Sequence, residues 1–304
     1  MKRRSFIQKT AVGTAALGLG GLGLQSFTSN YKKHLTILHT NDVHSHIDPF
    51  GPNEGRFSKL GGVARRATLI ENIRKENPNN LLLDAGDIFQ GTPYFNYYGG
   101  ELEFTLMSKL KYDAATLGNH DFDNGLEGLL AQLPNAQFPF VSANYDFKNT
   151  IMEGHTKPYT IFIKDGIKVG VFGLGVAFEG LVNKINYKET QYLDPVEIAQ
   201  DMTRILKENE NCDLIICLSH LGYYYKNNPD RVSDLNLAAK TKDIDLIIGG
   251  HTHTFLKKPT VTKNSEGKNM LINQVGCYGV NLGRIDFYFD DQMKTAADGT
   301  TIIV

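Results

Sequence analysis

Five short apolar runs in this chain each end in a cluster of histidine, aspartate or asparagine. The clusters read HTNDVHSH after Leu38, DAGD after Leu83, GNHDFD after Leu117, SHLG after Leu218 and GGHTH after Ile248. Short apolar runs that alternate with helix-like segments are typical of buried strands in an α/β domain. Because side chains just past the carboxyl ends of parallel strands face one crevice, we expect the five clusters to converge.

The spacing of apolar residues predicts the other elements. Strands are expected over residues 35–39, 81–83, 114–117, 140–143, 167–172, 214–218, 244–248, 271–275 and 285–289. Helices are expected over residues 63–76, 102–110, 126–133, 195–208 and 230–241. The last third has strand patterns without helices, which predicts antiparallel hairpins at its end. The closing TAADGTTIIV, residues 295–304, is either a tail or a last edge strand.

Composition limits the class of protein. With 304 residues and 41% apolar content, the chain can build one sizeable core, and no repeat or linker divides residues 31–304. A formal net charge of −1 argues against nucleic-acid binding, which needs a basic face. Cys212, Cys217 and Cys277 have no metal-ligand spacing, so we expect buried thiols.

Residues 1–30 resemble a twin-arginine export signal, because RRSFIQK precedes a weakly apolar, glycine-rich run. The run is too short and too rich in glycine to predict a membrane span. No A-x-A cleavage site follows it, so both a periplasmic protein and one tethered by an uncleaved signal stay open. The run contains GLGGLG at residues 18–23, but no strand precedes that pattern, which excludes a dinucleotide site.

The side chains gathered in the five clusters suit divalent metals. They are Asp42, His44, Asp87, Asn119, His120, His220, His251 and His253. Imidazole and carboxylate without thiolate favour Mn, Fe, Co or Zn. These groups are too many for one ion, whereas two metals that share a bridging carboxylate would use them, as hydrolytic enzymes do. Each motif alone has a structural explanation, such as a turn around Asp42, so the prediction rests on the joint pattern.

The motifs LHTNDVHSH, DAGDIFQGTP, LGNHDFDNG, LSHLG and GGHTH, in this order, resemble the calcineurin-like metallophosphoesterase superfamily. The match is closest to the catalytic domain of bacterial 5′-nucleotidases, and it runs from about residue 35 to residue 289. The resemblance implies a four-layer α/β/β/α sandwich with mixed sheets, in which a site for two divalent metals lies at the strand ends.

The resemblance also assigns site residues. It implies that one metal is held by Asp42, His44, Asp87 and His253, and the other by Asp87, Asn119, His220 and His251, with Asp87 bridging the two. His120 would face the leaving oxygen, Asp123 would orient His120, and Asp121 would serve the turn. His39 and His46 are expected to pack around the ligands or to hydrogen-bond to them.

The activity that the resemblance implies is hydrolysis of phosphoric monoesters, with a nucleotide as substrate and metal-activated hydroxide as nucleophile. Alternatives are a phosphodiesterase or nucleotide-sugar hydrolase, a relative that hydrolyses thiosulfonates, and a non-catalytic scaffold. The second, nucleotide-binding domain of the 5′-nucleotidases has no counterpart in these 304 residues. Two hypotheses stay open: the chain acts alone on small or exposed esters, or a separately encoded domain is its partner. The aromatic stretches PYFNYYGG and GYYYK, which begin at Pro93 and Gly222, favour such an interaction.

Overall fold

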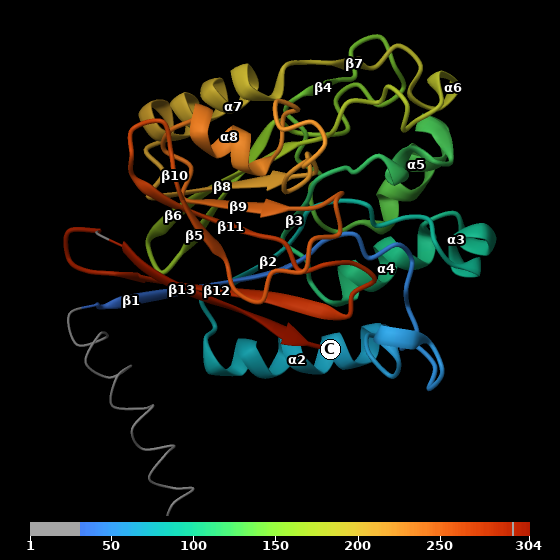
Figure 1. The fold of residues 1–304 in the computed structure, drawn as a ribbon, viewed down its shortest axis with the longest axis horizontal. Helices are drawn as coiled ribbons and strands as arrows, with labels where there is room; N and C mark the ends of the chain where they lie inside the picture. Colours follow the sequence, from blue (N-terminus) through green and yellow to red (C-terminus); the bar gives the residue numbers. More distant parts are fainter. Residues whose placement is uncertain (1–30, 294) are drawn as a thin grey trace, which may run out of the picture.

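The computed structural model describes residues 31–293 and 295–304, and the predicted export segment at residues 1–30 lies outside them. Two β-sheets pack face to face, and helices cover the outer face of each (Figure 1). On one side lie α2 (Val63–Glu76) and α4 (Glu101–Lys109), and on the other lie α7 (Pro195–Arg204) and α8 (Asp234–Lys240). This arrangement confirms the predicted α/β/β/α sandwich with mixed sheets.

The first sheet has its parallel strands at one edge and its antiparallel strands at the other. Its order is β13 (Thr295–Ile303), β12 (Asn281–Phe289), β1 (Lys33–Thr40), β2 (Asn80–Asp84) and β3 (Ala114–Ala115). The pairs β1 with β2 and β2 with β3 are parallel, whereas β12 is antiparallel to both β1 and β13. The closing segment of the chain is therefore the edge strand of this sheet.

The second sheet contains a parallel centre between two antiparallel edge strands. Its order is β10 (Thr260–Lys263), β11 (Asn269–Asn273), β9 (Leu246–Gly249), β8 (Leu214–Ser219), β6 (Ile167–Leu174) and β5 (Tyr159–Lys164). Only β5 and β10 pair antiparallel with their neighbours. Neither edge strand was predicted: β10 alternates half-buried with exposed residues, and β5 contains the short apolar run 161–163 but no fully buried residue. A small ribbon joins β4 (Tyr145–Asp146) to β7 (Gln191–Tyr192).

Helix ends follow their capping residues. The Asp194 side chain accepts the N–H groups of Val196 and Glu197 and so begins α7, which continues as a π-helical turn over Ile205–Asn209. The helix predicted over residues 230–241 begins only at Asp234, because Ser233 caps it. The remaining α-helices are α3 (Pro93–Tyr98), α5 (Gly125–Gln132) and α6 (Lys184–Tyr187), and 3-10 turns occupy Gly55–Phe57, His120–Phe122 and Leu133–Asn135.

Residues 140–143 were predicted as a strand but form only two isolated bridges, to Ala115 and to Lys157. The segment crosses from one sheet to the other: the N–H of Val141 donates to Ala115 beside β3, and the N–H of Ala143 donates to Gly173 in β6. A segment that changes sheets within three residues cannot build a continuous ladder with either one.

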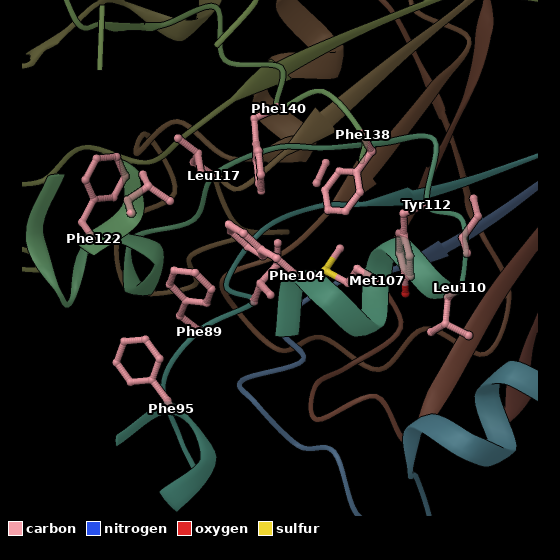
Figure 2. Close-up of a cluster of buried hydrophobic side chains, with 14 of the residues drawn as sticks. Phe89, Phe95, Phe104, Met107, Leu110, Tyr112, Leu117, Phe122, Phe138 and Phe140 are labelled. Atoms are coloured by element: carbon pink, nitrogen blue, oxygen red, sulfur yellow. The ribbon is translucent and has the colours of Figure 1, made fainter. Parts of the chain in front are cut away.

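The apolar core forms three layers. Between the sheets, Ile37 and Leu83 of the first sheet join Val171 and Ile248 of the second. Beneath α4, the ring of Phe104 packs against Phe89 and Phe140 at centroid distances of 4.7 and 5.0 Å, in the cluster that Figure 2 shows. The third layer lies under α7 and α8 and includes Cys212 and Cys217. Both are buried and free, as is Cys277, which confirms the prediction of buried thiols.

Among the described residues, no helix has the length and apolar character that crossing a membrane requires.

Candidate dinuclear metal centre

The five clusters predicted to converge meet where the two sheets end. Asp42 and His44 follow β1, Asp87 follows β2, Asn119 follows β3, His220 follows β8, and His251 and His253 follow β9. The backbone N–H of His251 donates to the Oδ1 atom of Asp42 at 2.9 Å, although 209 residues separate the two. The carboxyl ends of the parallel strands of both sheets therefore build one site.

One group at this site consists of Asp42, His44 and His253, whose ligand atoms all lie within 4.8 Å of one another. The Nε2 atoms of His44 and His253 are 3.0 Å apart, and Nε2 of His253 is 3.4 Å from Oδ1 of Asp42. Asp42 is fully buried. These three ligand atoms therefore lie close enough together to bind one metal ion.

The second group consists of Asp87, His220 and His251. Nε2 of His220 lies 3.0 Å from Oδ2 of Asp87, and Nδ1 of His251 lies 2.8 Å from Oδ1 of Asn119. The same Oδ2 atom of Asp87 is 3.8 Å from Nε2 of His44, which belongs to the first group. Asp87 is therefore the member of the second group that also lies beside the first.

The protonation of His220 tests whether these residues fit a cation. Its Nδ1 atom lies 2.7 Å from the carbonyl oxygen of Ala85, so Nδ1 carries the hydrogen that donates there. In the neutral ring the buried Nε2 atom, which has no hydrogen-bond partner, then presents a lone pair to the carboxylate of Asp87. A positive charge between the two lone pairs removes their repulsion, and a divalent metal supplies it, as a second ring proton does when no metal is bound. The donor set fits a metal.

The charges of the site shift its pKa values strongly when no cation is present. Burial lowers the pKa of His220, but the carboxylates of Asp87 and Asp42 outweigh burial and raise it to about 10. Burial raises the pKa of Asp87, but the His220 imidazolium outweighs it and holds the pKa below its ordinary value. Burial, together with the charge of His220, lowers the pKa of His251 to about 4. Protons and metal therefore compete for the same donors.

Five of the predicted ligands have a left-handed backbone. The φ angles are 50° at Asp42, 50° at His44, 54° at Asp87, 72° at His251 and 49° at His253. Aspartate and histidine adopt this region more readily than most residues, but it still costs free energy. Such strain is typical of functional sites, where the surrounding structure imposes it to aim side chains at one point.

Asp121 was predicted to serve the turn in which it lies, and it does more. Its carboxylate accepts the N–H of Gly118 at 2.8 Å within that turn. It also accepts the N–H groups of Asp87, Ile88 and Phe89, at distances of 3.0, 2.9 and 3.1 Å. The fully buried Asp121 thus ties the loop after β2 to the loop after β3. No signal in the sequence distinguishes this role from an ordinary turn.

His120 and Asp123 form the pair that was predicted. Nδ1 of His120 lies 2.9 Å from Oδ2 of Asp123, and its backbone N–H donates to Oδ1 of Asp87 at 2.8 Å. The ring meets that of His44 edge-on at a centroid distance of 5.3 Å. The hydrogen bond that the His120 ring donates to Asp123 raises the pKa of His120 against the opposing effect of burial. His120 therefore borders the two groups without belonging to either.

The two other histidines near the first motif have different surroundings. Nδ1 of His46 lies 2.8 Å from the carbonyl oxygen of His44, so His46 borders the site. His39 is buried between the sheets, with Nε2 at 2.9 Å from Nδ2 of Asn273. Sequence reasoning missed Asn41, whose amide donates to Oδ2 of Asp42 at 2.5 Å and to the carbonyl of Gly276 at 2.6 Å.

A two-sheet α/β sandwich with adjoining groups of buried imidazole and carboxylate at its strand ends is the architecture of a two-metal phosphoesterase. The chain belongs to the calcineurin-like phosphoesterase family, whose sequence model matches residues 35–255. The family uses two divalent metals, and the two groups provide a set of ligands for each.

Relatives of the chain include a snake venom 5′-nucleotidase of Naja atra, 38% identical over 89% of this chain and 53% of the relative. A trifunctional nucleotide phosphoesterase of Bacillus subtilis is 36% identical over 89% of this chain and 19% of the relative. The structure is similar to that of a 5′-nucleotidase precursor from Thermus thermophilus, with a TM-score of 0.81 and 36% identity, covering 90% of this chain and 55% of the other. The chain thus spans about half the length of the venom enzyme and of the Thermus protein.

Proposed function

We propose that this protein is a metal-dependent phosphoric monoester hydrolase of the 5′-nucleotidase type, with a nucleotide as its substrate. The observation that carries this proposal is the pair of donor groups that adjoin at Asp87, with His120 at their border. The names of the relatives, 5′-nucleotidases and a nucleotide phosphoesterase, support the substrate class.

In this proposal the side chains divide between two cations. The first group and Asp87 would hold one cation, and the second group, which includes Asp87, would hold the other together with Asn119. When bound, the two cations supply Lewis acidity toward the phosphoryl group and acidify water. The carboxylates of Asp42 and Asp87 bring a formal charge of −2 against +4, and the remaining positive charge favours a phosphate dianion.

His120 acts on the leaving oxygen. The hydrogen bond to Asp123 raises the pKa of His120, which favours the protonated imidazole, and the carboxylate holds Nδ1. Nε2 is then free to donate a proton to the oxygen that leaves phosphorus. The bond from the His120 N–H to Asp87 fixes the backbone from which the imidazole extends, so the donor keeps its place beside the shared ligand.

A substrate panel tests the proposal. The purified protein is loaded with Mn or Zn and assayed on nucleoside monophosphates, cyclic nucleotides, nucleotide sugars, aryl phosphates and a thiosulfonate. Nucleoside monophosphates should give the highest kcat/KM. Highest activity on a diester or a thiosulfonate would assign the alternative reactions. A protein that binds no stoichiometric metal would be a scaffold. Either of these two results would contradict the proposal.

We further propose that a separate nucleotide-binding domain covers the site by packing on the tyrosines of α3. Tyr97 and Tyr98 are 85% and 50% exposed, and with Tyr94 and Asp48 they line a hollow of about 570 Å³. Large exposed rings beside polar groups are typical of interaction surfaces. Adding such a domain should raise turnover of AMP relative to an aryl phosphate, and Tyr97→Ser should remove the gain. An unchanged ratio contradicts the proposal.

We also propose that residues 1–30 export the protein through a twin-arginine pathway, which RRSFIQK supports. Replacing Arg3 and Arg4 together by lysine should retain the protein in the cytoplasm, as cell fractionation would show. The size of the exported protein distinguishes a cleaved signal from one that tethers the protein to the membrane. Equal export of the double variant contradicts the proposal.

A further inference from the structure

The ring of Tyr278 lies between the first donor group and a cluster of outer aromatic rings. Its centroid is 6.0 Å from that of His44, 5.8 Å from that of His253 and 5.6 Å from that of Phe57. The side chain is half-buried, so part of the ring faces solvent beside the metal ligands. Nothing in the proposed chemistry uses this ring.

The backbone conformation at Gly276 and Tyr278 positions these aromatic rings. Tyr278 has a φ of 62°, a strained conformation for an aromatic residue, and its N–H donates to the carbonyl of Asp42 at 2.7 Å. A Cβ atom on Gly276 would come within 2.2 Å of the Phe255 ring. Only glycine therefore lets Phe255 lie over this loop, and the ligand Asp42 fixes the tyrosine.

The outer rings hold an arginine. The rings of Phe57 and Phe255 stack at 5.9 Å, and the guanidinium carbon of Arg56 lies 4.6 and 5.3 Å from their centroids. Among the residues that the structure describes, Arg56 forms no ion pair, so its exposed N–H donors stay available to a ligand. Beside these side chains is a hollow of about 220 Å³, to which Asn281 contributes.

Ring contacts connect the rings beside this hollow to the proposed site, because Tyr278 contacts both Phe57 and His44. His120, the proposed proton donor to the leaving oxygen, meets His44 at 5.3 Å, and Tyr278 meets the same ring at 6.0 Å. Tyr278 therefore borders the same predicted ligand as the proposed proton donor, and Phe57 and Arg56 lie beyond Tyr278.

We propose that Tyr278, Phe57, Phe255 and Arg56 form a subsite for the leaving group, which takes a planar heteroaromatic ring with hydrogen-bond acceptors at its edge, as in a purine base. The inference rests on the proposed function and names where this chain itself recognises the nucleoside. Rings and guanidinium stack on bases, and the guanidinium donors match the paired acceptors at the edge of guanine.

Two measurements test the subsite. The first compares kcat/KM for a purine nucleoside 5′-monophosphate with that for ribose 5-phosphate, which has the same reacting centre without the base. Phe255→Ala, Phe255→Leu and Arg56→Ala should each lose about tenfold on the nucleotide, and less than about twofold on ribose 5-phosphate. Arg204→Ala, an exposed arginine on α7, is the matched control and should change neither value.

The second measurement is binding of adenosine and guanosine, which carry no phosphate, by calorimetry in the metal-loaded protein. Wild type should bind them saturably, and the same variants should weaken binding about tenfold. Equal losses on both esters, or variants that keep nucleoside binding, overturn the subsite; the latter result assigns base recognition to another domain. A wild type that binds nucleosides through these residues but hydrolyses neither ester refutes the proposed function alone.

Discussion

The carboxylate of Asp121 accepts the backbone N–H of Asp87 at 3.0 Å and so fixes the member of the second donor group that lies 3.8 Å from His44 of the first. Asp121 follows β3 and Asp87 follows β2, so the bond joins the loops of two neighbouring parallel strands. The carboxylate of Asp121 also accepts the N–H groups of Ile88, Phe89 and Gly118, and these four donors leave it no capacity for a metal. Asp121 lies in the same motif as the predicted ligand Asn119, but its hydrogen bonds show that it positions the loop of Asp87.

Replacing Asp121 by alanine should therefore reduce both stability and metal content. Four buried N–H groups would lose their acceptor, which should lower the free energy of unfolding by about 3 kcal/mol or more. Asp121→Asn keeps one acceptor oxygen, so its stability and metal content should lie between those of wild type and Asp121→Ala. Urea unfolding and metal analysis measure these effects. Asp201→Ala, an exposed aspartate on α7, serves as control, and full metal occupancy in Asp121→Ala would refute the positioning role.

The pair of His120 and Asp123 predicts a loss of activity without a loss of metal. His120→Ala removes the proton donor and should lower kcat by about 10² to 10⁴. Asp123→Asn keeps the imidazole but lowers its pKa, so its loss should be smaller, and the basic limb of its pH profile should move to lower pH. Exposed His155 provides the control variant His155→Ala. Full activity of His120→Ala would show that another group serves the leaving oxygen.

Removing metal should destabilise the fold. Asp42 and Asp87 are buried, and a cation that binds only the folded state stabilises it by mass action, by about 2.7 kcal/mol at a concentration of 100 Kd. The urea midpoint should rise with added Mn and fall with a chelator. Asp87→Asn, which weakens both groups, should show a much smaller rise. A midpoint that does not respond to metal in wild type would count against the donor groups as a metal centre.

Burial of His39 makes stability depend on pH. Burial lowers the pKa of His39 from 6.5 to about 3, so between these values the unfolded chain binds a proton that the folded chain does not. Its contribution to stability is therefore complete above about pH 6.5 and falls by about 1.4 kcal/mol per pH unit below it. His39→Gln should be less stable than wild type at pH 7.5, and the difference should shrink at pH 5. A difference that stays constant between these pH values would contradict a neutral His39.

The central strands and their polar ends could be predicted because each depends on a local pattern. β8 and β9 are nearly continuous apolar runs, β1 has Leu35, Ile37 and Leu38 at its centre, and α2 has the predicted bounds. The elements that were missed, such as β5 and β10, lie at sheet edges, where none of their residues is fully buried. The segment 140–143 is apolar because it passes between the sheets, which a local pattern cannot distinguish from a strand.

The sequence by itself determined the α/β sandwich, the family and the residues that gather at the strand ends, because apolar periodicity and ordered motifs are local properties. Only the tertiary structure decided the distances at which the two groups adjoin at Asp87, and that Asp121 holds this loop by its backbone. It alone placed Tyr278 between His44 and Phe57. These contacts join segments that are as many as 209 residues apart in the sequence. The packing of one sheet on the other sets the distances between them.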